Sequence, residues 1–172
     1  TIPRLDVLSA DGSLRKFHQS LNSKKQARQR MAEALGRLTE DYGLIIIDCP
    51  PMITPQMEGV LRAVDRILVP VEPSVLSIRA YQQIREQFDW AKKSQWLPFV
   101  TMIDRRKPAH LHWIKTGLED FPEILRTFVA YSASAERMLA LRNPIVEQQP
   151  TVPLARNYQA LWKAVKPKLN LR

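Results

Sequence analysis

Long apolar runs and paired cysteines are both missing from this sequence. No uninterrupted apolar stretch approaches the roughly 18 residues that a membrane-spanning helix needs, and the aliphatic run at residues 44–47 ends on Asp48. Cys49 is the one cysteine in 172 residues, which excludes an intrachain disulfide and fits a reducing compartment. No signal peptide is visible at the N-terminus. These absences predict a cytoplasmic protein.

Acidic residues are missing from two stretches that are rich in cations. There is no acid between Asp11 and Glu33, and none after Glu147. The formal net charge of the chain is +9. Segregated positive charge favours contact with a polyanion such as DNA, RNA or an anionic membrane, and the alternative is a solvated basic surface. The cations of the two stretches are Arg15, Lys16, Lys24, Lys25, Arg28 and Arg30, and Arg156, Lys163, Lys166, Lys168 and Arg172.

The apolar pattern predicts strands that alternate with helices. Short runs rich in aliphatic or β-branched residues indicate strands at residues 5–8, 44–47, 66–71, 98–102 and 127–130. Helical spacing indicates helices at residues 23–38, 57–64, 74–91, 110–117 and 153–165. The run at 44–47 has no polar alternation, which is typical of a central parallel strand covered on both faces. We therefore predict a doubly wound, mostly parallel α/β sheet, and one domain over residues 1–172.

Asp48 is the residue with the clearest chemical meaning. A carboxylate that directly follows a buried strand lies at the edge of an α/β sheet where ligands bind. There it can order a hydrated Mg²⁺ beside a nucleotide phosphate, because this ion keeps several of its waters. The alternative is an acid that merely ends a strand.

Four segments in order resemble the ParA/MinD family of deviant Walker A P-loop ATPases. YGLIIIDCPP at residues 42–51 is similar to the Walker B and switch II segment of that family. AVDRILVPVEP at 63–73, TMIDRR at 101–106 and NPIV at 143–146 resemble its later segments. The resemblance covers the chain from about residue 40 to its end, and it implies a P-loop NTPase-like fold that is incomplete at the N-terminal side.

The resemblance also implies ligands and partners. Members of this family use ATP or ADP with Mg²⁺, form a homodimer with ATP, bind DNA non-specifically, and release it when a ParB-like or cargo-adaptor protein stimulates hydrolysis. It places Asp48 as the catalytic residue that holds Mg²⁺ through water, and Pro50 and Pro51 in the switch loop. Asp104 lies where the family approaches the nucleotide. Tyr131, beside the expected base pocket, either stacks on adenine or packs as an ordinary tyrosine.

Arg106 falls on an arginine that contacts DNA in the ParA branch. Arg105 and Lys107 flank it, Arg137 can replace a second family arginine if its stretch is helical, and Lys163 and Lys166 can extend the surface. The alternative is that Arg106 pairs with Asp104 or Glu72. DNA binding implies a nucleoid-associated location.

The family's glycine-rich Walker A loop has no counterpart here. Only five glycines occur, and no G-x-x-x-x-G-K-[ST] pattern can be drawn. Without backbone amides and a lysine around the phosphates, we expect the chain alone not to hydrolyse ATP.

Three other interpretations remain open at this point. One is a non-catalytic pseudo-ATPase interaction module, and another is an ATPase of the same fold that serves a different pathway, such as polysaccharide secretion. The third is a MinD-like membrane-associated ATPase. Pro167 interrupts the basic tail, so no stable membrane anchor is expected.

Overall fold

The computed structural model describes residues 4–9, 24–49, 55–88, 95–141, 143–169 and 171. The chain divides into two compact units, residues 1–64 and 65–172, and each is described by itself. The single domain predicted for residues 1–172 stays a prediction.

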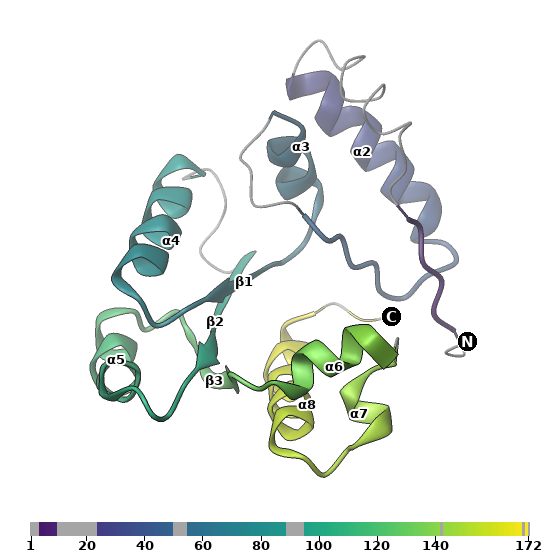
Figure 1. Cartoon of the computed structure of the whole chain (residues 1–172). Coiled ribbons are helices and arrows are strands. Elements are labelled where there is room, and N and C mark those ends of the chain that lie inside the picture. Colours follow the sequence, from purple (N-terminus) through teal and green to yellow (C-terminus); the bar gives the residue numbers. More distant parts are fainter. Residues whose placement is uncertain are drawn as a thin grey trace. The chain divides into compact units, whose positions relative to one another are not determined.

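Two helices form the described secondary structure of residues 1–64. Helix α2 spans Lys24–Leu38 and helix α3 spans Pro55–Ala63, and the two helices pack against each other (Figure 1). Residues 4–9 and 42–49 are neither helix nor strand. The Tyr42 hydroxyl donates a hydrogen bond of 2.7 Å to Asp6 Oδ2, which ties these two segments together.

The strands predicted at 5–8 and 44–47 are wrong for the described structure. Neither segment is assigned as a strand, and Ile46 is 83% exposed rather than buried. An aliphatic run becomes a central strand only when neighbouring strands satisfy its N–H and C=O groups. The described part of residues 1–64 contains no strand that does this.

Residues 65–172 build a three-stranded parallel sheet flanked by helices, which is the predicted mixed α/β class. Strands β1 (Ile67–Val71), β2 (Trp96–Ile103) and β3 (Leu125–Ala130) lie in the order β1-β2-β3. Register pairs include Ile67 with Trp96 and Val100 with Phe128. Helix α4 (Val75–Gln87) connects β1 to β2, and α5 (Pro108–Asp120) connects β2 to β3. Sequential parallel strands joined by helices are typical of doubly wound sheets.

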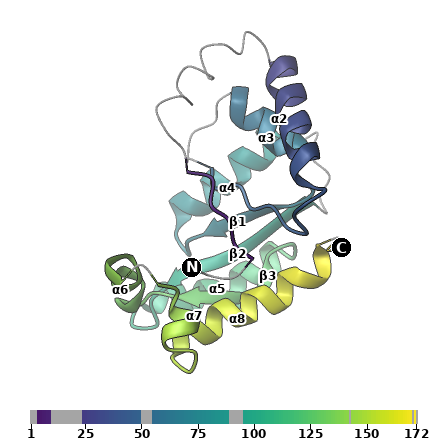
Figure 2. The same cartoon turned by 90° about the vertical axis from the view of Figure 1, so that its right-hand side faces the viewer.

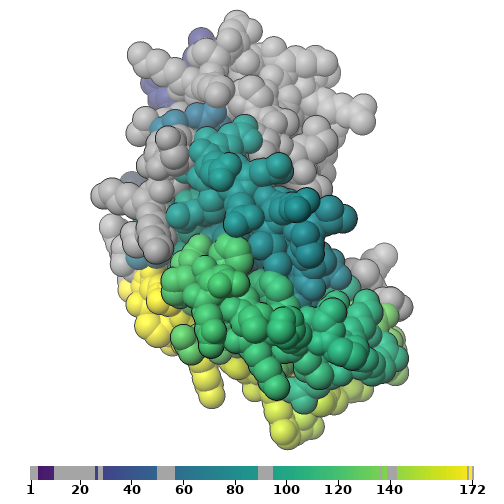
Figure 3. Space-filling view, turned by 90° about the vertical axis from the view of Figure 1, so that its left-hand side faces the viewer, coloured from purple at the N-terminus to yellow at the C-terminus, as the bar shows by residue number. Residues whose placement is uncertain are grey.

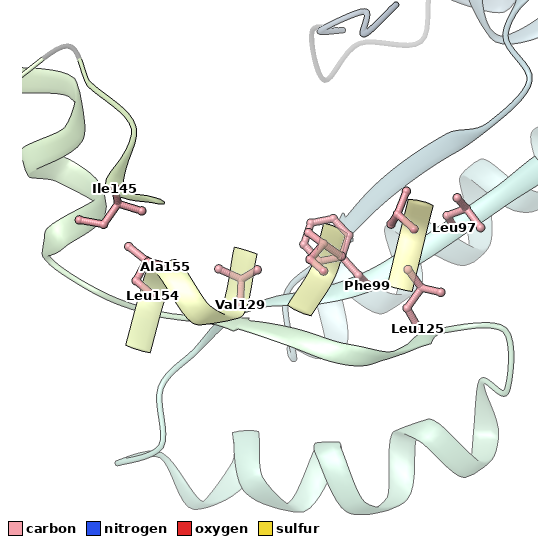
Figure 4. Packing of buried hydrophobic residues seen from close by; sticks show 9 residues of the cluster. Leu97, Phe99, Leu125, Val129, Ile145, Leu154 and Ala155 are labelled. Carbon is pink, nitrogen blue, oxygen red and sulfur yellow. The ribbon is translucent and has the colours of Figure 1, made fainter. Parts of the chain in front are cut away.

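Helices lie on both faces of the sheet, although Leu68 and Pro70 of β1 remain exposed. Helices α4 and α5 lie on one face, which Figure 3 shows in space-filling form, and α8 (Pro153–Val165) lies on the other (Figures 1 and 2). The α8 face contains a core cluster whose buried residues Figure 4 shows as sticks. Val100 and Ile103 pack on the α5 side with Ile124. The cluster under α8 consists of Leu97, Phe99, Leu125, Val129, Ile145, Leu154, Ala155, Leu161 and Val165.

Short elements complete the unit. Helices α6 (Ser134–Leu141) and α7 (Ile145–Gln148) follow β3, and a 3₁₀ turn, η2 (Lys166–Lys168), follows α8. The sequence predicted neither α7 nor η2, because one turn of helix is too short to show a period. Arg137 lies in helix α6, so its stretch is helical, which was the condition for it to replace a second family arginine.

Candidate functional site

The carboxyl ends of the three strands gather at one edge of the sheet. Because the strands are parallel, the loops after Val71, Ile103 and Ala130 emerge on the same side. The backbone N–H of Tyr131 donates to the carbonyl of Ile103 over 2.9 Å, which holds the last two loops together. Open α/β sheets bind ligands at this edge. We call it the carboxyl edge.

The end of β2, which leads into the loop that contains Asp104, is irregular. The register of β2 against β3 shifts between Val100 and Ile103, as at a β-bulge or a similar irregularity. Met102 has a φ of 57°, in the left-handed region that a residue with a side chain rarely adopts. Bulges and strained backbone of this kind concentrate beside functional loops. The irregularity stands directly before Asp104.

Asp104 and Arg106 form a closed pair in that loop. Arg106 donates from Nε to Asp104 Oδ1 and from Nη2 to Oδ2, both over 2.9 Å, and its backbone N–H donates to Oδ1 over 3.0 Å. The backbone N–H of Lys107 donates to the Asp104 carbonyl over 3.0 Å, so the four residues form a turn. Hydrogen bonds from Arg106 lower the pKa of the Asp104 carboxyl from 3.8 to about 2. The structure therefore has the ion pair that the sequence analysis gave as the alternative for Arg106.

Arg105 and Lys107 remain exposed on either side of this pair. The Arg105 guanidinium lies over the Phe128 ring at 5.7 Å from its centroid, a cation–π contact. Lys107 stands at the N-terminus of α5 and makes no side-chain cap there. Both cations, like the Arg106 guanidinium, face solvent at the carboxyl edge.

The structure brings Tyr131 and Arg137 to the same edge. The hydrogen bonds to Asp104 raise the pKa of the Arg106 guanidinium, and Tyr131, which is 46% exposed, adds a smaller effect in the same direction. Arg137, in the first turn of α6, donates from Nη2 to Ser134 Oγ over 3.2 Å. Four cations and one exposed aromatic ring thus share the carboxyl edge.

Lys163 and Lys166 lie at the opposite edge. Helix α8 runs antiparallel to the strands, because Asn157 near its start accepts from the backbone N–H of Ala130 at the end of β3. At its far end, Arg66 just before β1 donates to the Lys168 carbonyl over 2.6 Å. From the sequence, Lys163 and Lys166 were expected to extend the DNA-binding surface around Arg106. Their position shows that they do not extend the cationic surface of the carboxyl edge.

His110 is a residue whose role the sequence did not reveal. It is 7% exposed in the first turn of α5, and its Nδ1 accepts from the backbone N–H of Asp104 over 3.2 Å. Its side chain therefore holds the start of the Asp104 turn. Periodicity cannot show this, since nothing in the spacing of Asp104 and His110 indicates that one caps the other.

Asp48 belongs to the other unit, near the end of the segment 42–49, which is neither helix nor strand. Its side chain is exposed, and its negative charge helps to raise the pKa of the half-buried Cys49 thiol, for which burial is the larger cause. An exposed carboxylate fits a water-mediated Mg²⁺ contact, because this ion takes few protein ligands. Asp104 does not fit, because Arg106 occupies both of its oxygens. Pro50 and Pro51 lie outside the described residues.

Two further features are missing from the described part of the chain. It contains no group of three or more His, Cys, Asp or Glu side chains placed to hold a metal ion. None of its helices is long and apolar enough to cross a membrane.

Comparisons with known proteins agree with the fold. Residues 1–97, more than half of the chain, match the family model described as "AAA domain". The chain is 28% identical over 89 residues to a chromosome partitioning protein ParA of Myxococcus xanthus, which covers 52% of this chain and 31% of that protein. It is 26% identical over 114 residues to a chromosome partitioning protein ParA of Caulobacter vibrioides, covering 61% and 42%. The chain therefore matches between about a third and two fifths of the length of these relatives.

Proposed function

Because the chain belongs to the AAA domain family of ParA/MinD-type P-loop ATPases, we propose that the whole protein is a DNA-associated partitioning or positioning ATPase. It uses ATP with Mg²⁺, dimerises around ATP and associates with the nucleoid. A ParB-like or cargo-adaptor protein stimulates hydrolysis and releases it from DNA. The cargo is a chromosome, a plasmid or another large body.

The cationic carboxyl edge is the observation that supports DNA binding. Arg105, Arg106 and Lys107 follow one another on one exposed loop, and Arg137 lies at the same edge. Exposed cations concentrated on one surface neutralise phosphates and release counterions, which gives affinity without reading sequence. We see no helix among the described elements that resembles a base-reading module. Binding is therefore expected to be indifferent to sequence.

Asp48 is the proposed Mg²⁺ ligand of the intact protein. Its exposed carboxylate would hold the ion through a water molecule, and Pro50 and Pro51 would stiffen the switch loop that follows. When bound beside the nucleotide, the ion would neutralise the charge that develops on the transferred phosphoryl group.

Salt-dependent DNA binding tests this proposal. The full-length protein is mixed with a labelled duplex of arbitrary sequence, with ATP and Mg²⁺ or with ADP, and anisotropy is measured between 50 and 200 mM salt. We expect ATP-dependent binding that weakens with salt by about 0.9 log units per log unit of salt for each phosphate contact. Arg106→Ala should weaken binding to every duplex and flatten that slope by about one per contact. Unchanged binding in this variant would remove Arg106 from the DNA surface.

A further inference from the structure

The Asp104 turn satisfies its own polar groups. The Asp104 N–H donates to buried His110, its carbonyl accepts from Lys107, and its two carboxylate oxygens accept from Arg106. The Asp104 side chain is 14% exposed, whereas the Arg106 side chain is 80% exposed. The exposed Arg106 guanidinium, which an incoming anion would meet, is therefore already paired with the less exposed Asp104 carboxylate.

We propose that Asp104 sets the strength of phosphate binding at the carboxyl edge by competing with the phosphate for Arg106. This inference rests on the DNA-binding function proposed above. Carboxylate and phosphate are both bidentate acceptors for the planar fork of a guanidinium. A DNA phosphate that takes Nε and Nη2 of Arg106 must displace the Asp104 oxygens from the same two atoms.

Two hydrogen bonds to its backbone limit how far Asp104 can withdraw after it is displaced. Its backbone is held on one side by the His110 hydrogen bond of 3.2 Å and on the other by the Lys107 hydrogen bond of 3.0 Å. A displaced carboxylate would stay beside the bound phosphate as an uncompensated like charge, which opposes binding. Asp104 thus acts as an internal competitor that weakens one phosphate contact and favours release.

The Asp104→Asn variant removes the negative charge of the side chain and keeps its shape. Asn Oδ1 can still accept from the backbone N–H of Arg106, so the turn keeps its side-chain closure, and asparagine favours such turns. Asp104→Ser is a second variant, since a hydroxyl closes the same kind of turn more weakly. Asp120→Asn is the matched control, because it removes the same charge from the far end of α5. That helix of 13 residues is about 20 Å long, more than the screening length of about 8 Å at physiological salt.

The experiment compares these variants with the wild type and with Arg106→Ala in the full-length protein. Anisotropy of a labelled duplex is measured with ATP and Mg²⁺ at several salt concentrations, and circular dichroism verifies folding. We expect Asp104→Asn to bind about two- to fivefold more tightly at 100 mM salt, the range of an exposed ion pair. Its salt slope should steepen by about 0.9. Asp104→Ser should shift in the same direction, and Asp120→Asn should stay within twofold of wild type.

Two results overturn the inference in different ways. If Arg106→Ala weakens binding while Asp104→Asn and Asp104→Ser bind no tighter than wild type, Asp104 does not compete and the proposed DNA function stands. If Arg106→Ala itself binds like wild type, no phosphate reaches Arg106, and the proposed DNA surface fails together with the inference. Tighter binding in Asp120→Asn of the same size as in Asp104→Asn would assign the effect to net charge alone and would also overturn it.

Discussion

Replacing Gly36 with alanine should raise the free energy of unfolding, whereas replacing Gly117 with alanine should lower it. Gly36 is exposed on α2, and apart from its chain neighbours and the backbone of its own helix, nothing lies within 4 Å of the place that a Cβ would occupy. Gly117 is buried in α5, and a Cβ there would lie 2.5 Å from Cε2 of the Trp113 indole, one helical turn earlier. Neither glycine has a positive φ, so alanine fits both backbones without strain.

The magnitudes follow from this difference. Alanine in a helix interior is favoured over glycine by about 0.8–1.0 kcal/mol, which Gly36→Ala should gain in full. Gly117→Ala gains the same term but must move an indole that packs against the core cluster of Val100, Ile103 and Ile124. Overpacking of this kind costs about 1–3 kcal/mol. The expected net result is a loss of up to about 2 kcal/mol, with about 1 kcal/mol in the middle of the range.

Urea denaturation measures both effects. All four tryptophans of the chain lie after residue 64, so their fluorescence reports on residues 65–172, whereas far-ultraviolet circular dichroism reports on both units. The Gly117→Ala midpoint should fall by about 0.5 M and the Gly36→Ala midpoint should rise by a similar amount. In a Trp113→Ala background, Gly117→Ala should become stabilising, because the obstructing ring is gone.

Gly117→Ala offers a direct refutation. If it stabilises the wild-type protein as much as Gly36→Ala does, the indole does not lie over Gly117 and the packing of α5 is wrong. If it destabilises equally with and without Trp113, a different contact is responsible.

Two further predictions concern the same unit. The Ser74 side chain accepts from the Ser77 N–H over 3.2 Å at the N-terminus of α4. Ser74→Ala should therefore lower the free energy of unfolding by about 1 kcal/mol, whereas Ser74→Asp should not, because it restores an acceptor. Equal losses in both variants would contradict the cap. The pKa of Asp104 lies below its ordinary value, so its ion pair with Arg106 stabilises the folded state above about pH 3.8, and this contribution is lost as the pH falls to about 2. The difference in urea midpoint between wild type and Asp104→Asn should therefore be constant from pH 5 to 8 and shrink between pH 4 and 2. A difference that instead changed between pH 6 and 8 would point to another titrating group.

Sequence pattern predicted most of residues 65–172 because local pattern and final burial agree there. The runs around Val71 and Val100 became strands, and Ser74 caps the helix that was expected after it. The run at 44–47 failed for the opposite reason. Four aliphatic residues show a capacity for burial on two faces, but pairing depends on strands that the run itself does not encode, and Ile46 is exposed.

The candidate site was predicted at the level of position but not of contact. Strand ends placed Asp104 and Arg106 at the carboxyl edge, since that follows from parallel topology. Their pairing depends on the turn at Asp104 and on the hydrogen bond from that residue to His110, six positions later. Charge counting treats Arg105, Arg106 and Lys107 as three equal cations, whereas the structure shows one in an ion pair, one over an aromatic ring and one exposed at a helix start.

The separation of the basic residues changes how the charge of the chain is to be interpreted. Arg105 and Lys107 stand at the carboxyl edge, whereas Lys163 and Lys166 stand at the other end of the strands. From Asn157 the chain advances by about 9 Å to Lys163 and by about 14 Å to Lys166, and both distances exceed the screening length of about 8 Å at physiological salt. Charges so far apart and exposed to solvent act on a polyanion independently of one another. The net charge therefore does not describe one continuous binding surface, and any short-range control by Asp104 acts on the carboxyl edge alone.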